Sequence, residues 1–160
     1  MAKSISVLPE QEQQYLTITG KTSITLAFFL LAELLSTVIS KTDSVIYLLV
    51  DLTLFASFIY FLVLGTKSMK FAKHISKLGF WTYKFNDEYV DYVSSLSLRA
   101  ICHIMVIGGA FLAYSGDSKW FVELIAPFNP TDALQILLCL AAATHGALIL
   151  WKLGKEELYE

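Results

Sequence analysis

Four stretches of this sequence are almost free of charged side chains, and this feature limits the fold more than any other. Each stretch is 17 to 23 residues long, and the two that contain a charge contain one each. A helix that crosses about 30 Å of hydrocarbon needs roughly 20 residues at 1.5 Å each. Because hydrocarbon offers the backbone no hydrogen-bond partner, each stretch is predicted to be a helix. The predicted spans cover about 22–40, 44–66, 98–116 and 133–151.

The composition of the chain agrees with a membrane protein. Hydrophobic residues make up 56% of the sequence and charged residues 16%, and the mean hydropathy is +0.59. Soluble domains carry roughly 25% charged residues. A soluble helical bundle is disfavoured, because none of the four stretches shows the polar stripe of a water-facing helix. We therefore expect an all-α membrane protein, with one polytopic domain over residues 1–160 and a four-transmembrane-helix bundle.

Several function classes are excluded by charge and motif content. The net charge of -2 gives no basic footprint for a nucleic acid. The two cysteines show no Cys/His spacing, so no metal site is expected. No catalytic or phosphate-binding motif is present, which predicts that the chain is not an enzyme. The polar run at 9–14 lacks the pattern of a signal peptide.

The distribution of basic residues predicts the orientation in the membrane. Two of the 12 lysines and arginines, Lys41 and Lys119, flank the predicted spans on one side, and the other ten lie on the opposite side. Since basic residues stay on the cytoplasmic side, both termini and the central loop are predicted to be cytoplasmic. We expect a bacterial inner membrane, with the inner membrane of an organelle as the alternative.

The loop between the second and third spans has its own pattern. A basic amphipathic helix is predicted over about 67–79, because its lysines fall on one side of a helical wheel and its apolar residues on the other. This interfacial helix and the aromatic residue that follows it would contact anionic lipids, or dock a cytosolic partner within residues 67–98. The residues that carry this prediction are Lys67, Lys70, Lys73, Lys77 and Trp81.

Two short polar runs resemble helix starts. Asn86, Asp87 and Glu88 predict that the third span has a cytoplasmic extension from about residue 87. Asn129 and Pro130 predict the start of the fourth span, because Asn caps helices well and Pro suits the first helical position.

Each predicted span contains one ionisable side chain: Glu33, Asp51, His103 and His145. Such residues are costly in hydrocarbon and mark functional sites by default. Glu33 lies eight residues before Lys41 and Asp51 eight residues after Asp43, so the two carboxyl groups are expected at matching depth. They would share a proton, bind a cation, or hydrogen-bond across helices as neutral acids. Together, the four groups outline a proton or cation path, or a polar seam that only fixes helix pairing.

The two histidines also allow a different interpretation. His103 and His145 both lie in the predicted cytoplasmic half, at depths that could be level. Paired histidines on separate helices are the axial ligands of b-type haem in helical bundles. A haem-binding cytochrome subunit is therefore an alternative, although it leaves Glu33 and Asp51 without a role.

The preferred functional interpretation is a subunit of a homo-oligomer or of a larger membrane complex, forming a proton or cation path. Its partners would be the lipid bilayer, further copies of the chain or other membrane subunits, and no cofactor is required. Besides the cytochrome subunit, one alternative remains open. The chain could be a membrane anchor or sensor that recruits a cytosolic effector in signalling or defence.

Overall fold

The computed structural model describes residues 8–39, 44–71 and 84–156. Within these residues the chain forms five helices and no strand, and four of the helices are long and apolar enough to cross a membrane. This confirms an all-helical chain with four candidate membrane spans. The helices are α1 (Pro9–Val38), α2 (Ser44–Phe71), α4 (Glu88–Ser115), α5 (Lys119–Ile125) and α6 (Pro130–Glu156).

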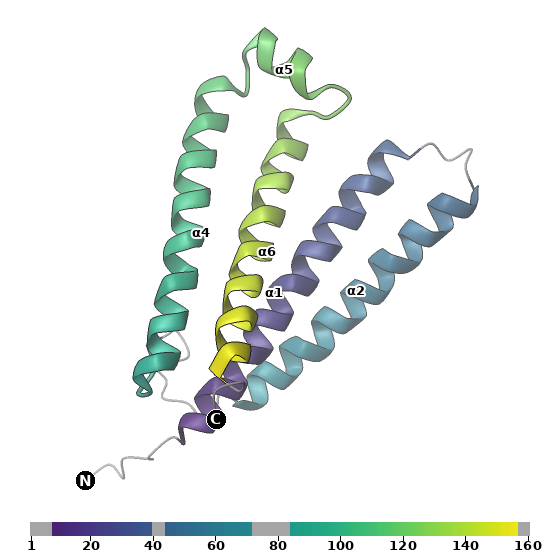
Figure 1. Cartoon of the computed structure of the whole chain (residues 1–160). Coiled ribbons are helices and arrows are strands. Elements are labelled where there is room, and N and C mark those ends of the chain that lie inside the picture. Colours follow the sequence, from purple (N-terminus) through teal and green to yellow (C-terminus); the bar gives the residue numbers. More distant parts are fainter. Residues whose placement is uncertain (1–7, 40–43, 72–83, 157–160) are drawn as a thin grey trace.

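The four long helices lie side by side in the order α4, α6, α1, α2 (Figure 1). Helices α1 and α6 pack on each other and each has one outer neighbour, while α2 and α4 have no extensive contact with each other. The described helices therefore form an open row, which is less closed than a four-helix bundle. We call the end with the starts of α1 and α4 and the ends of α2 and α6 the base, and the end with α5 the distal end (Figure 1).

Helix α1 begins well before the first predicted span. Pro9 takes the first helical position, and Glu10 and Glu12 lie in the first turn, where carboxylates interact favourably with the helix dipole. Its 30 residues correspond to about 45 Å at 1.5 Å per residue, against roughly 30 Å of hydrocarbon. The first turns of α1 therefore extend beyond the apolar span, at the base.

The starts of α4 and α6 confirm the two predicted helix starts. Asp87 is the N-cap of α4, and its side chain accepts a hydrogen bond from the Val90 N–H at 2.8 Å. Before α6, the Asn129 Oδ1 accepts from the N–H groups of Thr131 at 2.8 Å and Asp132 at 3.0 Å. Both caps satisfy amide donors that the first helical turn leaves open.

A core cluster of buried apolar side chains lies at the base. It joins the first turns of α1, the start of α4 and the last turns of α6, and the Tyr15 and Phe85 rings lie 6.1 Å apart between centroids. The Tyr89 hydroxyl donates to the Lys152 carbonyl at 2.7 Å, which ties α4 to α6. The members of this base cluster are Tyr15, Leu16, Phe85, Val90, Val93, Ile149 and Leu153.

Glycines allow α1 and α6 to approach closely just above the base cluster. A Cβ atom on Gly146 would lie 2.5 Å from the Gly20 carbonyl oxygen, and one on Gly20 would lie 2.9 Å from an Ile149 methyl group. Side chains larger than hydrogen would therefore push the two helices apart. Close contact at small residues is the usual means by which membrane helices associate.

Candidate functional site

Two regions hold carboxyl groups that need an explanation, and the first is at the base. Glu12, in the first turn of α1, is 1% exposed. Its carboxylate accepts hydrogen bonds from the Asn86 N–H at 3.0 Å, the Asp87 N–H at 2.9 Å and the Asn86 side-chain amide at 3.0 Å. The carboxylate thus lies at the N-terminus of α4, where both the open amides and the helix dipole favour a negative charge.

The interaction of Glu12 with α4 closes the base of the row. It joins residues that are 74 positions apart and brings the first turn of α1 against the start of α4. Sequence reasoning missed it, because the run at 9–14 looked like a polar tail. The signal that was present is local: a proline followed by two glutamates, Glu10 and Glu12, is the pattern of a helix start.

The second region lies within the apolar spans and includes Glu33. The Glu33 side chain is exposed, and its carboxylate accepts a hydrogen bond from the Gln135 side-chain amide at 3.1 Å. The same amide nitrogen lies 3.0 Å from the Leu30 carbonyl oxygen and donates to it as well. The hydrogen-bond partner of Glu33 is therefore on α6, whereas the expected partner, Asp51, is on α2.

Asp51 lies on α2, the helix at one end of the row, and its side chain is not packed against α1. The side chains of α2 that are at least partly buried recur every three or four residues, as in a coiled-coil seam, and Asp51 lies beside this stripe. Asp51 is exposed, and no hydrogen bond or ion pair joins it to another described residue. The buried stripe consists of Tyr47, Val50, Leu54, Ser57, Phe61, Leu64, Ser68 and Phe71.

Glu33 and Asp51 nevertheless lie on the same face of the α1–α2 pair. The rings of Phe29 on α1 and Phe58 on α2 contact each other, with centroids 5.9 Å apart. Glu33 lies four residues after Phe29, and Asp51 lies seven residues before Phe58. Since residues four or seven apart share a helix face, both acids lie distal to this aromatic pair on one face. We call it the acidic face.

The hydroxyl groups of the spans differ from these acids, because they are satisfied within their own helices. The side chains of Thr22, Thr25 and Thr53 donate to backbone carbonyls four residues earlier, at 2.8 Å each. Such bonds let a hydroxyl sit in an apolar span without a partner on another helix. Among the described residues, the carboxyl groups of Glu33 and Asp51 form no such hydrogen bond within their own helices.

The two histidines face different surroundings. His145 on α6 is 6% exposed and therefore lies in the protein interior. His103 on α4 is exposed, and its Nδ1 lies 2.7 Å from the Arg99 carbonyl oxygen of the same helix. Gly108 abuts Leu137 of α6, and His103 lies five residues earlier, about 140° around α4 at 100° per residue. His103 therefore points away from α6, and haem ligation by this pair stays a prediction.

The predicted docking lysines fall partly outside the described residues. Lys67 and Lys70 are exposed and belong to the last turns of α2, which continues without a break to Phe71. Lys73, Lys77 and Trp81 lie outside the described residues, as does most of the predicted interfacial helix. Within the described part of the chain, no three His, Cys, Asp or Glu side chains are grouped so that they could hold a metal ion.

Comparison of the chain with protein-family models, with curated proteins and with solved structures found no match. The function of the chain is therefore inferred from the geometry of its acidic residues, Glu12 at the base and Glu33 and Asp51 in the spans.

Proposed function

We propose that this chain is a subunit of an oligomeric membrane complex in which several copies surround a path for protons or cations, lined by Glu33 and Asp51. The observation that carries the proposal is the position of Asp51. It is exposed on the outermost helix, within an apolar stretch, and no described residue pairs with it. A carboxylate in this place needs a partner, and the described residues of one chain supply none.

The energetic cost of Glu33 and Asp51 depends on the surroundings of the acidic face. A charged side chain at the centre of a span costs about 2.5–3.5 kcal/mol on insertion scales. That cost falls if the carboxyl group meets water, a cation or another protein surface instead of hydrocarbon. The apolar spans contain no lysine or arginine that could neutralise Glu33 or Asp51. Their charge can then be balanced by a proton on each carboxyl group, or by a proton or cation shared between them, which is the arrangement that the proposed path uses.

The outer surface of α2 supports association with another copy of the chain. It is apolar along most of its length, and α1 is the only described helix that packs on it extensively. Lipid can cover the apolar side chains, whereas it cannot satisfy Asp51. In a ring of copies, the acidic faces would meet around a common axis, and their carboxyl groups would line it. The large exposed side chains of α2 in its central part include Leu48, Leu52, Phe55, Ile59 and Leu62.

Flux through reconstituted vesicles tests the proposed path. Vesicles containing the protein should conduct protons or small cations when a gradient is applied. Glu33→Gln and Asp51→Asn should each slow the flux at least tenfold, because an amide neither shares a proton nor binds a cation as a carboxylate does. Glu123→Gln, at an exposed position of the distal α5, is the matched control and should conduct like the wild type. Equal flux in all four proteins would overturn the path.

Disulfide cross-linking tests the subunit contact separately. In a background without Cys102 and Cys139, a cysteine at exposed Phe55 should form a covalent dimer in vesicles. A cysteine at Leu64, which is 3% exposed and packs in the α1–α2 seam, should not. A monomer at both positions would contradict an α2-mediated oligomer.

The effector-recruiting alternative makes the opposite prediction. If the chain anchors a cytosolic partner, Lys67→Gln and Lys70→Gln should abolish function in the host while Glu33→Gln and Asp51→Asn leave it intact. A subunit that conducts ions should show the reverse pattern.

A further inference from the structure

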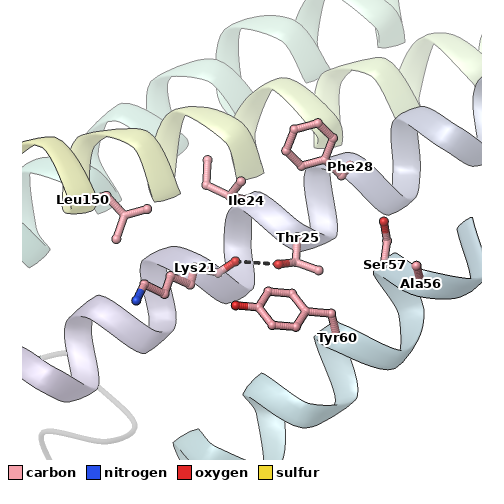
Figure 2. A pocket seen from close by; sticks show the side chains of 8 residues that line it. All are labelled: Lys21, Ile24, Thr25, Phe28, Ala56, Ser57, Tyr60 and Leu150. Atoms are coloured by element: carbon pink, nitrogen blue, oxygen red, sulfur yellow. Dashed lines mark hydrogen bonds between the residues drawn. The ribbon is translucent and has the colours of Figure 1, made fainter. Parts of the chain in front are cut away.

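A groove lies between α1 and α2, with a charged side chain at one end and apolar side chains at the other. Figure 2 shows its eight lining side chains, which come mostly from these two helices, with Leu150 contributed by α6. The cavity has a volume of about 460 Å³ and a predominantly apolar lining. This volume lies within the roughly 300–1,000 Å³ of sites that bind small molecules. The lining residues are Lys21, Ile24, Thr25, Phe28, Ala56, Ser57, Tyr60 and Leu150.

Among the described residues that line the groove, Lys21 alone is charged, and it lies at the end nearer the base. In Figure 2 the Tyr60 hydroxyl points toward the side where Lys21 lies, while Phe28 and Ala56 lie toward the other end. The Thr25 hydroxyl already donates to the Lys21 carbonyl, at 2.8 Å, so it remains an acceptor for a bound group. Lys67 lies seven residues after Tyr60 and therefore on the same face of α2, closer to the base.

The depth of Lys21 matches the boundary between hydrocarbon and headgroups. It precedes residue 31, the middle of the first predicted span, by about 15 Å at 1.5 Å per residue, which is half of the roughly 30 Å of hydrocarbon. The apolar end of the groove then lies deeper in the bilayer. A ligand would have its charged end at the interface and its apolar end toward the midplane, which is the orientation of a phospholipid.

The groove is open toward the surrounding bilayer. Phe28 is 57% exposed and Tyr60 is 51% exposed, so a molecule can enter sideways from the membrane. Small side chains at Ala56 and Ser57 leave the space that a lipid chain needs between the helices. Basic pockets between membrane helices are known to hold anionic lipid headgroups.

From these features we infer that the groove is a binding site for one anionic phospholipid of the leaflet on the base side, with its headgroup at Lys21 and an acyl chain against Phe28 and Ala56. The site is independent of the proposed path, because the groove and the Phe29–Phe58 contact that marks the acidic face involve opposite flanks of α2. Tyr60 and Phe58 are two residues apart, about 200° around the helix.

Native mass spectrometry of the full chain, in neutral detergent with equimolar phosphatidylglycerol and phosphatidylcholine, tests the site. The wild type should retain one phosphatidylglycerol in preference to phosphatidylcholine. Lys21→Gln should lower the retention of phosphatidylglycerol about fivefold, which corresponds to about 1 kcal/mol for one lysine. Lys155→Gln is the matched control, because Lys155 is exposed in the last turn of α6 and carries the same charge near the base without lining the groove.

A second pair of variants tests the apolar end. Ala56→Phe should fill the groove and reduce retention of both lipids, whereas Ala113→Phe, at an exposed position of α4, should bind as the wild type does. Lys21 also lines a separate, more polar hollow at the base, which Ala56 does not line. Ala56→Phe therefore tests the groove alone. The inference is wrong if Lys21→Gln and Lys155→Gln behave alike, or if Ala56→Phe retains lipid as Ala113→Phe does.

Discussion

Two glutamates on helix α1 meet opposite conditions. Glu12, at the base, is 1% exposed and receives hydrogen bonds from two backbone amides and one side-chain amide. Glu33, within the apolar span, is exposed, and among the described residues it receives one hydrogen bond, from Gln135. A buried carboxylate requires several donors to offset the loss of hydration. The described residues supply several such donors to Glu12 at the base, whereas in the span they supply one to Glu33 and none to Asp51.

The apolar side chains show the same contrast. The largest side chains that are almost completely buried, Leu16, Ile149 and Val93, all belong to the base cluster. In the central part of α2, by contrast, most large apolar side chains are exposed. Lipid can solvate these side chains as well as protein can, so they exert little force on helix pairing. The largest fully buried apolar side chains of the described residues are therefore concentrated at the base, whereas the central part of α2 exposes its apolar surface.

The largest stability effect should follow from removing the Glu12 carboxylate. Glu12→Ala leaves the amides of Asn86 and Asp87 without their acceptor, and hydrogen bonds to charged groups contribute about 1.5–3 kcal/mol each. We expect a loss of about 3 kcal/mol in the free energy of unfolding, measured by denaturant titration in mixed micelles. Glu10→Ala, on the exposed side of the same turn, should change it by less than about 0.5 kcal/mol. Equal effects would show that the hydrogen bonds of Glu12 do not stabilise the base.

The glycine contact between α1 and α6 should give the second largest effect. Gly146→Ala places a methyl group against the Gly20 carbonyl oxygen, and overpacking of this kind costs about 1–3 kcal/mol. Gly154→Ala is the control on the same helix, because its Cβ would meet nothing within 4 Å. It should stabilise the helix by up to about 1 kcal/mol, since alanine loses less conformational freedom than glycine on folding. A lower free energy of unfolding in Gly146→Ala and a higher one in Gly154→Ala would support the close contact of α1 and α6 at Gly20 and Gly146.

The hydrogen bond that joins α4 to α6 at the base should contribute less to the free energy of unfolding. Tyr89→Phe removes the hydroxyl that donates to the Lys152 carbonyl, and a neutral hydrogen bond contributes about 0.5–1.5 kcal/mol. Tyr92→Phe, at an exposed position of the next turn, should leave the free energy of unfolding unchanged. A loss in Tyr92→Phe as large as in Tyr89→Phe would mean that the hydroxyl contact does not stabilise the base.

The features that could be predicted from the sequence are those determined by neighbouring residues. The starts of α4 and α6 depend on caps within three residues, so Asp87 and Asn129 were sufficient to predict them. The four long apolar helices follow from the absence of charge over about one bilayer thickness. The contact of Glu12 with Asn86 could not be predicted, because it depends on how distant helices pack. The directions of His103 and His145 depend on the same packing.

The smallest effect should come from the hydrogen bond between Gln135 and Glu33, which is the counterpart in the span of the Glu12 contact at the base. Hydrogen bonds between membrane helices average about 0.6 kcal/mol in double-mutant cycles, because the separated helices also find partners. We expect the cycle of Glu33→Gln and Gln135→Leu, measured by unfolding in mixed micelles, to give a coupling energy near this value, several times below the loss in Glu12→Ala. A coupling above about 2 kcal/mol would exceed the range seen for such bonds. It would mean that Glu33 holds α1 and α6 together, and an acid at this position would then be explained without an ion path.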